Sequence, residues 1–260
     1  MAKVIAIINQ KGGVGKTTTA VNLSALLGAM GQRVLMIDLD PQGNTTSGLG
    51  MEVDDKSIYE VIMGRMKLTD VMEETEFKNL SIAGSDVRLA NAELELVEVE
   101  KREYRLKTAV QSAQQDIDFI FIDCPPSLGL LTINALGAAD SVLIPIQCEY
   151  YALEGVASLM NTISRVKKTI NPHLEIEGVL LTMLDGRTNL GLQVVDEVKK
   201  HFKKQVYATV IPRSVRLGEA PSHGEPIHVY DKRSAGCVAY VNLAKEVLKR
   251  NNIKVKEFKL

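Results

Sequence analysis

The sequence is poor in cysteine, in long apolar runs and in net charge, and each scarcity excludes a class of protein. Its three cysteines, Cys124, Cys148 and Cys237, are widely spaced and odd in number, which argues against a disulfide framework or a zinc knuckle. We expect each to be a small buried hydrophobic side chain. No apolar run approaches the roughly 20 residues that a membrane span needs, and the first run is too short for a signal peptide. We therefore expect a cytoplasmic protein without stable membrane insertion.

The net charge is close to zero, but the charges are unevenly distributed. The 260 residues have a formal net charge of −1. Residues 51–103 contain 14 acidic and 7 basic side chains, whereas residues 187–216 contain 7 basic and 2 acidic ones. This asymmetry indicates a basic face, although lysine pairs such as those at 199–200 and 203–204 are also common on solvated helices.

Short apolar runs alternate with longer helical patterns along the chain. Strands are expected at 4–8, 33–38, 80–83, 119–123, 142–146, 179–183 and 206–211, and helices at 17–29, 92–103, 152–170, 193–202 and 235–250. Because apolar strands that alternate with helices are typical of a parallel sheet covered on both faces, we predict an α/β fold with a mostly parallel twisted sheet. No linker or repeat is evident, so residues 1–260 are expected to form a single domain.

A glycine-rich loop separates the first expected strand from the first expected helix. The glycines let backbone N–H groups approach phosphate oxygens, and the helix N-terminus adds a partial positive charge. In a P-loop the lysine, here Lys16, reaches the β- and γ-phosphates, and the following hydroxyl, here that of Thr17, ligates Mg²⁺. The expected nucleotide-binding residues of this loop are Lys11, Gly12, Gly13, Val14, Gly15, Lys16, Thr17 and Thr18.

The loop departs from the usual P-loop pattern. Gln10 stands where the pattern has glycine, and a second lysine, Lys11, precedes Gly12. This form is the deviant Walker A motif, and by it the chain resembles the ParA/MinD group of ATPases, to which the nitrogenase iron protein is related. The resemblance implies that Lys11 crosses a dimer interface to the partner's nucleotide. A glycine-rich turn without a nucleotide is the alternative, and the flanking strand and helix argue against it.

Carboxylates follow two other expected strands. Asp38 and Asp40 flank one residue, and in an extended segment their side chains point the same way. Asp123 directly follows four hydrophobic residues. This is a Walker B pattern, which places a carboxylate near Mg²⁺. By the resemblance these segments are switch I and switch II, and Asp40 matches the aspartate required for hydrolysis. The expected metal site is Thr17, Asp40 and Asp123, and the expected catalytic residues are Lys11, Lys16 and Asp40.

The resemblance also assigns residues after the last two expected strands. The segment Ile-Pro-Arg-Ser-Val-Arg at 211–216 contacts adenine in the family, which implies nucleotide contacts from Pro212 and Ser214. Family members often have Asn where this chain has Ser214, so its contact with the base stays open. Arg187 and Arg216 match arginines that bind DNA in Soj-type relatives; solvated loop arginines are the alternative.

The resemblance covers essentially the whole chain and is strongest to chromosomal ParA proteins of the Soj type. It implies a partitioning ATPase that uses ATP and Mg²⁺. Its ATP-bound sandwich homodimer would bind double-stranded DNA without sequence preference, and a ParB-type partner would stimulate slow hydrolysis and release. The expected location is the nucleoid.

Three alternatives stay open. A MinD-like membrane-cycling ATPase needs an amphipathic tail; residues 241–250 are amphipathic, although a closing helix packed on the sheet explains them better, and residues 251–260 have few large hydrophobes. An electron-transfer iron protein needs cysteines from each subunit around a shared cluster, and Cys124 lacks a convincing ligand spacing. A nucleotide-dependent scaffold without hydrolysis is disfavoured by Asp40.

Overall fold

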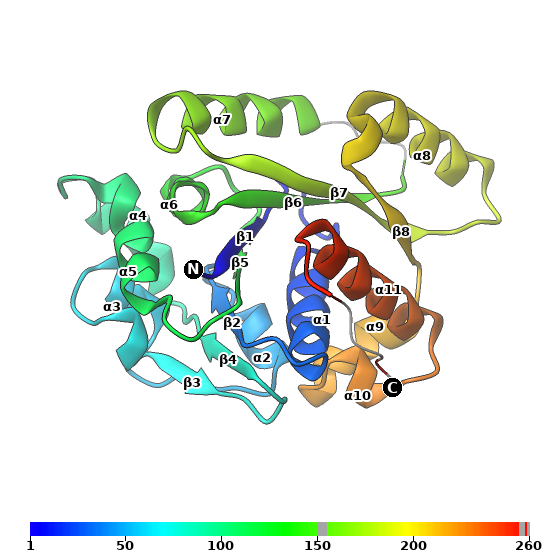
Figure 1. Cartoon of the computed structure of the whole chain (residues 1–260). Coiled ribbons are helices and arrows are strands. Elements are labelled where there is room, and N and C mark those ends of the chain that lie inside the picture. The colour runs from blue at the N-terminus through cyan, green and yellow to red at the C-terminus, as the bar shows by residue number, and fades with distance from the viewer. Residues whose placement is uncertain (150–154, 255–257, 259–260) are drawn as a thin grey trace.

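One sheet runs through the molecule and carries helices on both faces (Figure 1). The computed structural model describes residues 1–149, 155–254 and 258. The strands are β1 (Lys3–Ile7), β2 (Val34–Asp38), β3 (Met72–Glu74), β4 (Leu80–Ala83), β5 (Phe119–Asp123), β6 (Ser141–Gln147), β7 (Glu175–Leu184) and β8 (Val206–Pro212). The α-helices are α1 (Lys16–Ala29), α2 (Asn44–Gly48), α3 (Ile58–Ile62), α4 (Leu89–Glu95), α5 (Arg105–Ala113), α6 (Leu130–Ala138), α7 (Val156–Thr169), α8 (Asn189–Phe202), α9 (Val215–Glu219), α10 (Ile227–Tyr230) and α11 (Ala235–Arg250).

The strand order places the polar strand ends at one edge of the sheet. The order is β3-β4-β2-β5-β1-β6-β7-β8, and within the described chain every neighbouring pair is parallel except β3 and β4. Asp123 at the end of β5 is in register with Asp38 of β2 and Ile7 of β1. Because the three strands end level with one another, the loops that follow them open on the same edge.

Each face of the sheet has its own hydrophobic core. On one face α1 and α11 pack together against the strands, with Leu26 and Leu243 fully buried. Helix α1 is buried on nearly all sides because it packs on the sheet and is flanked by α11, α2 and α10 (Figure 1). On the other face, residues such as Leu106 of α5 and Leu136 of α6 pack against Ile122 and Ile144. The two cores fix the strand ends from both sides.

The predicted fold class is confirmed, and the three cysteines are buried and free as predicted. The helix expected at 92–103 is wrong, because α4 ends at Glu95 and turns follow up to a 3₁₀ turn at Arg102–Tyr104. Lys101 has a φ of 53°, a left-handed conformation that cannot continue an α-helix. Residues 152–154 of the helix expected at 152–170 lie outside the described residues. No helix in the described ranges is long and apolar enough to span a membrane.

Candidate nucleotide site

The glycine-rich loop between β1 and α1 is held in shape by buried hydrogen bonds. Asn9 donates from Nδ2 to the carbonyl oxygen of Pro145 at 2.7 Å, and its Oδ1 accepts the backbone N–H of Lys11 at 3.0 Å. Thr182 Oγ1 donates to the carbonyl oxygen of Val14 at 2.8 Å. Gly15 has a φ of 89°, which favours glycine. The loop is therefore anchored to β6 and β7.

The end of this loop has the features of an anion site. Lys16 begins α1 and is 6% exposed. The N-terminus of α1 has no side-chain cap, so its first N–H groups are left for a ligand. Gly12 and Gly13 are exposed, and a Cβ built on either would meet nothing within 4 Å. Backbone donors, a helix N-terminus and a buried lysine together suit a polyphosphate.

Asp123 collects two hydroxyl groups at the end of β5. Oγ1 of Thr17 and Oγ1 of Thr45 each donate to its Oδ2 at 2.7 Å. Its Oδ1 is buried and has no hydrogen-bond partner among the described residues. Burial raises the pKa of Asp123 to about 6, while the two hydroxyls and the charge of Lys16 act in the opposite direction. A buried carboxylate with an unused oxygen favours a nearby cation.

These groups fit Mg²⁺ in the way P-loops hold it. Within the described ranges, no group of three or more His, Cys, Asp or Glu residues could hold a metal ion by itself. Mg²⁺ commonly keeps several waters and takes one or two protein ligands plus substrate phosphates. Thr17 and Asp123 supply such a sparse donor set, and the orphaned Oδ1 of Asp123 can accept from a metal-bound water.

The two carboxylates at the end of β2 do not act as a pair. Asp38 is fully buried, and its Oδ2 accepts from the backbone N–H and from Oγ1 of Thr46 at 2.9 and 2.7 Å. Burial, and then the charge of Asp123, raises the pKa of Asp38 to about 7. Asp40 is 8% exposed, and its Oδ1 accepts the backbone N–H of Gln42 at 3.0 Å. Asp38 thus fastens the switch I loop, while Asp40 keeps an oxygen for the site.

A cavity of about 190 Å³ adjoins the phosphate loop. It is lined by Gly15 of the loop, Thr18 of α1, Pro212 at the end of β8 and Ser214 just after it. Met183, whose φ is 52°, also lines it. The structure therefore brings together the two segments that the sequence assigned to the nucleotide, around a space suited to a flat ring.

The two predicted DNA-binding arginines lie at the same edge of the sheet. Arg187 follows β7 and Arg216 follows β8, and these strands end side by side, with Leu184 in register with Pro212. Both arginines are exposed. Each is paired with a carboxylate: Arg187 with Asp185 at 2.7 Å, and Arg216 with Glu219 at 2.8 Å. The lysines at 199–200 and 203–204 are exposed on α8 and just after it.

Comparisons with known proteins match this geometry over the length of the chain. The family model described as "AAA domain" matches residues 2–176. The sporulation initiation inhibitor protein Soj of Bacillus subtilis is 59% identical over 249 residues, which cover 95% of this chain and 98% of that protein. The chain belongs to the ParA family of ATPases. The chromosome partitioning protein ParA of Myxococcus xanthus is 51% identical over 256 residues, or 98% of this chain and 90% of that protein.

A solved structure shows the same fold at lower identity. The crystal structure of cobyrinic acid a,c-diamide synthase from Mycobacterium smegmatis, with bound ADP and magnesium, has a TM-score of 0.86 and 37% sequence identity. The match covers 97% of this chain and 96% of that one. The predicted family, the ATPase class and the P-loop fold are thus confirmed.

Several residues that hold the ParA site together were not expected from the sequence. Asn9 and Thr182 fix the P-loop, and Thr45 and Thr46 bind Asp123 and Asp38. Thr45 and Thr46 could have been identified from the sequence, because they directly follow the Asp-Leu-Asp-Pro-Gln-Gly-Asn segment. No local pattern pointed to Thr182, since its hydrogen-bond partner lies 168 positions away in the chain.

Proposed function

We propose that this ParA-family ATPase binds MgATP at the P-loop, forms a homodimer in that state, and binds double-stranded DNA without sequence preference until a ParB-type partner stimulates hydrolysis. The observation that carries the proposal is the position of Arg216. Arg216 lies two residues after Ser214, and Ser214 lines the cavity beside the P-loop. A nucleotide in that cavity therefore touches the segment that presents Arg216 to solvent.

The phosphate groups would be held by the loop backbone, the N-terminus of α1 and Lys16. Thr17 and Asp123 would hold Mg²⁺ directly or through water, and the bound MgATP supplies the phosphoryl group that is transferred to water. Asp40 would orient the attacking water, because its carboxylate is nearly buried and accepts the N–H of Gln42 at only one oxygen. Pro212 would pack on the base.

Lys11 supports the dimer. Its backbone N–H binds Asn9, and its side chain forms no ion pair within the described part of the chain. It is followed by the exposed Gly12 and Gly13, which leave room for a second molecule to approach the loop. A lysine with no partner at the mouth of a phosphate site fits a role toward the nucleotide of the other subunit.

The membrane-cycling alternative is less well supported. Val247 and Leu248 of α11 are buried in the core, and Ile253 and Phe258 after the helix pack against the same core. These apolar side chains are therefore used within the fold rather than offered to a lipid surface. Residues 255–257 and 259–260 of the expected tail lie outside the described residues. The buried cysteines likewise disfavour a shared iron–sulfur cluster.

The decisive experiment is binding to a random DNA duplex across a salt series. It uses the Asp40→Ala protein without nucleotide, with ADP and with ATP, so that the ATP state persists. We expect binding only with ATP and a steep loss of affinity with rising salt, because released counterions drive association with phosphates. Arg216→Ala should weaken DNA binding with unchanged ATP affinity.

The matched control is Arg165→Ala, which removes an exposed arginine from α7. It should bind DNA like the parent protein. An ATP-dependent dimer that binds no DNA at any salt concentration would overturn the proposal, and sedimentation with anionic liposomes would then test the membrane alternative.

A further inference from the structure

A second pocket lies beside α3 and α5, away from the residues assigned to the nucleotide. Its volume is about 410 Å³. It is formed by the end of α3 with the turn after it, by residues between 100 and 104, and by one face of α5 from Arg105 to Ser112. In Figure 1, α3 and α5 lie on the side of the sheet opposite α11. The nucleotide site therefore does not account for this pocket.

The pocket is lined mainly by positive charges, although the surrounding part of the chain is acidic. Three cationic side chains line it, those of Lys67, Lys101 and Arg105, against one carboxylate, that of Glu100. Hydroxyls come from Tyr104, Thr108 and Ser112. Residues 51–103 carry 14 acidic and 7 basic side chains, so a solvated surface in this stretch would be acidic. The concentration of cations around one cavity needs a specific reason.

Arg105 lacks the partner that comparable arginines have. Its Nε is buried and makes no hydrogen bond to any described residue. The other half-buried arginines of the described chain all form ion pairs: Arg88 with Asp86, Arg102 with Glu103, and Arg250 with Glu246. A buried donor without a partner in the protein is unfavourable, and a ligand in the pocket would supply an acceptor.

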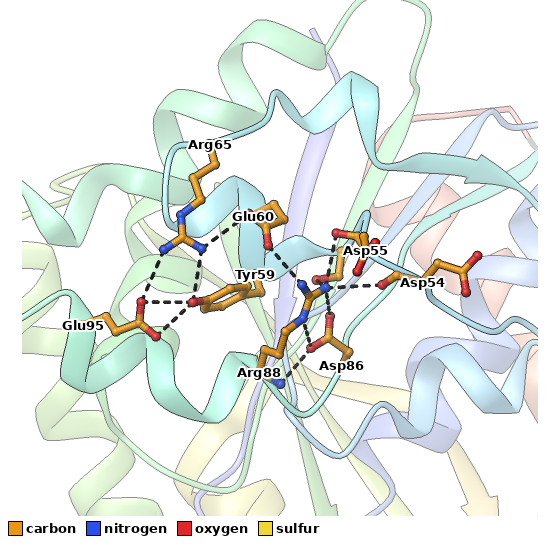
Figure 2. Close-up of polar contacts among 9 residues, drawn as sticks. Asp54, Asp55, Tyr59, Glu60, Arg65, Asp86, Arg88 and Glu95 are labelled. Atoms are coloured by element: carbon orange, nitrogen blue, oxygen red, sulfur yellow. Dashed lines mark hydrogen bonds and ion pairs between the residues drawn. The ribbon is translucent and has the colours of Figure 1, made fainter.

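A neighbouring cluster shows how other arginines in this region are paired with carboxylates. Figure 2 shows Arg65 between Glu60 and Glu95, and Arg88 against Asp86 and Glu60. Those two guanidinium groups are neutralised by the protein's own carboxylates. Arg105 is not neutralised in this way, because the only carboxylate among the residues that line its pocket belongs to Glu100, which forms no ion pair with it within the described residues.

The Arg105 side chain also lies close to the backbone at Gly64. A Cβ built on Gly64 would lie 2.6 Å from Nη1 of Arg105, and Gly64 has a φ of 74°. The guanidinium group therefore lies over a glycine on the wall of the pocket, where the backbone carries no side chain between them.

We propose that the pocket lined by Lys67, Lys101 and Arg105 binds the phosphate group of a small molecule. Three cations and one carboxylate leave a surplus of two positive charges, which matches a phosphate monoester dianion. The planar fork of an arginine binds two phosphate oxygens at once, and lysines add point charges. The volume falls in the range of about 300–1,000 Å³ that is typical of small-molecule sites, so the ligand can carry an organic body.

The test is calorimetric titration of the full chain with glycerol 3-phosphate at physiological salt. Saturating MgADP keeps the P-loop filled, so that the titrant cannot report on the nucleotide site. We expect saturable binding of one equivalent per chain. Arg105→Gln should weaken the affinity at least tenfold, and Lys101→Gln, which changes an exposed residue, should also weaken it. Inorganic phosphate in a parallel titration shows whether the phosphate group alone is enough.

The matched control is Lys107→Gln, which removes a cation from the same helix at a position that does not line the pocket. It should leave the affinity unchanged. Absence of saturable binding in the parent protein would overturn the proposal, as would an equal loss in the Lys107 and Arg105 variants, because that result would indicate unspecific attraction. Circular dichroism melting of each variant separates a lost site from a lost fold.

Discussion

Two threonine hydroxyls from different segments converge on Asp123, with the charge of Lys16 nearby. The arrangement makes the carboxylate the electrostatic centre of the phosphate site. Burial raises its pKa to about 6, which means that the fold opposes its charge and that a cation beside it would relieve the cost. The residues around Asp123 are thus better suited to a site with Mg²⁺ than to one without it.

The first prediction concerns Asp40, the nearly buried carboxylate of switch I. Asp40→Ala should bind ATP with an affinity close to that of the parent, because the phosphate contacts come from the P-loop. Hydrolysis should fall at least a hundredfold, since the water would lose the group that orients it, and the ATP-bound dimer should accumulate. Phosphate release and analytical ultracentrifugation measure the two effects.

Asp196→Ala is the control for this prediction, because it removes an exposed carboxylate from α8. It should hydrolyse ATP at the parental rate. Normal turnover by Asp40→Ala would show that Asp40 has no part in hydrolysis, whatever the state of the dimer.

The second prediction concerns Gly12. A Cβ at this position meets nothing within 4 Å, and no left-handed φ requires glycine there. Gly12→Val should therefore fold with unchanged stability but fail to form the ATP-dependent dimer, because the branched side chain would intrude where a partner approaches. Size-exclusion chromatography with light scattering in the presence of ATP measures the dimer.

Gly186→Val adds the same side chain at another open glycine with no left-handed φ, and it should dimerise normally. An ATP-dependent dimer in the Gly12 variant would remove this loop from the interface.

At the scale of single elements, sequence patterns correctly predicted helices whose ends are fixed by residues nearby in the chain. Helix α11 was predicted with its observed bounds, and Ser234 caps it by accepting the N–H of Cys237 at 3.1 Å. Helix α6 was not predicted, because its sequence is apolar on most sides and its start is set from a distance: Glu93 accepts the N–H of Leu131 at 3.2 Å. A pattern within a short stretch of sequence cannot reveal such long-range hydrogen-bond partners.

The third prediction concerns α9, a helix that carries both Arg216 and Glu219, the nearer of the two carboxylates that pair with it; the other is Asp231. Glu219→Gln should strengthen DNA binding of the ATP state, because DNA phosphates would no longer compete with Glu219 for Arg216. Both side chains are more than a third exposed, at 56% and 39%, so solvent screens the pair and its contribution is small. The expected gain in affinity is therefore about two- to fivefold, measured by fluorescence anisotropy at low salt.

Glu175→Gln removes the same charge at the start of β7, the opposite end of that strand from Arg187, and should change the affinity less. If the two variants gained equally, the gain would reflect overall charge, and the Arg216–Glu219 pair would have no special role.

At the scale of the whole molecule, the sequence predicted the sheet and half of the site. Apolar strands that end in Asp38 and Asp123 were enough to predict parallel strands with carboxylates at one edge. The contacts of Asn9 with Pro145 and of Thr182 with Val14 depend on which strands become neighbours. Strand order is a property of the whole chain, so these residues had no signal before the topology was known.

The stability of the whole molecule should also depend on pH through His228 of α10. Nδ1 of His228 is buried without a partner among the described residues. Burial, and then the charge of Lys232, lowers the pKa of His228 from 6.5 to about 4. The unfolded chain therefore takes up the proton first as the pH falls. The stabilisation from the neutral ring is complete above about pH 6.5 and is lost progressively toward pH 4.

This fourth prediction is measured by urea unfolding at pH 7.5 and pH 5.0. The parent protein should lose about 1 kcal/mol more free energy of unfolding between these values than His228→Gln does, a figure reduced from the full shift because the ring is partly exposed. The comparison uses the change with pH, so a constant effect of the substitution cancels. His173→Gln, at an exposed position, should keep the parental pH dependence. If His228→Gln also kept it, the acid sensitivity of the fold would have to come from other groups, and the buried carboxylates Asp38 and Asp123 could not supply it, because their raised pKa values act with the opposite sign.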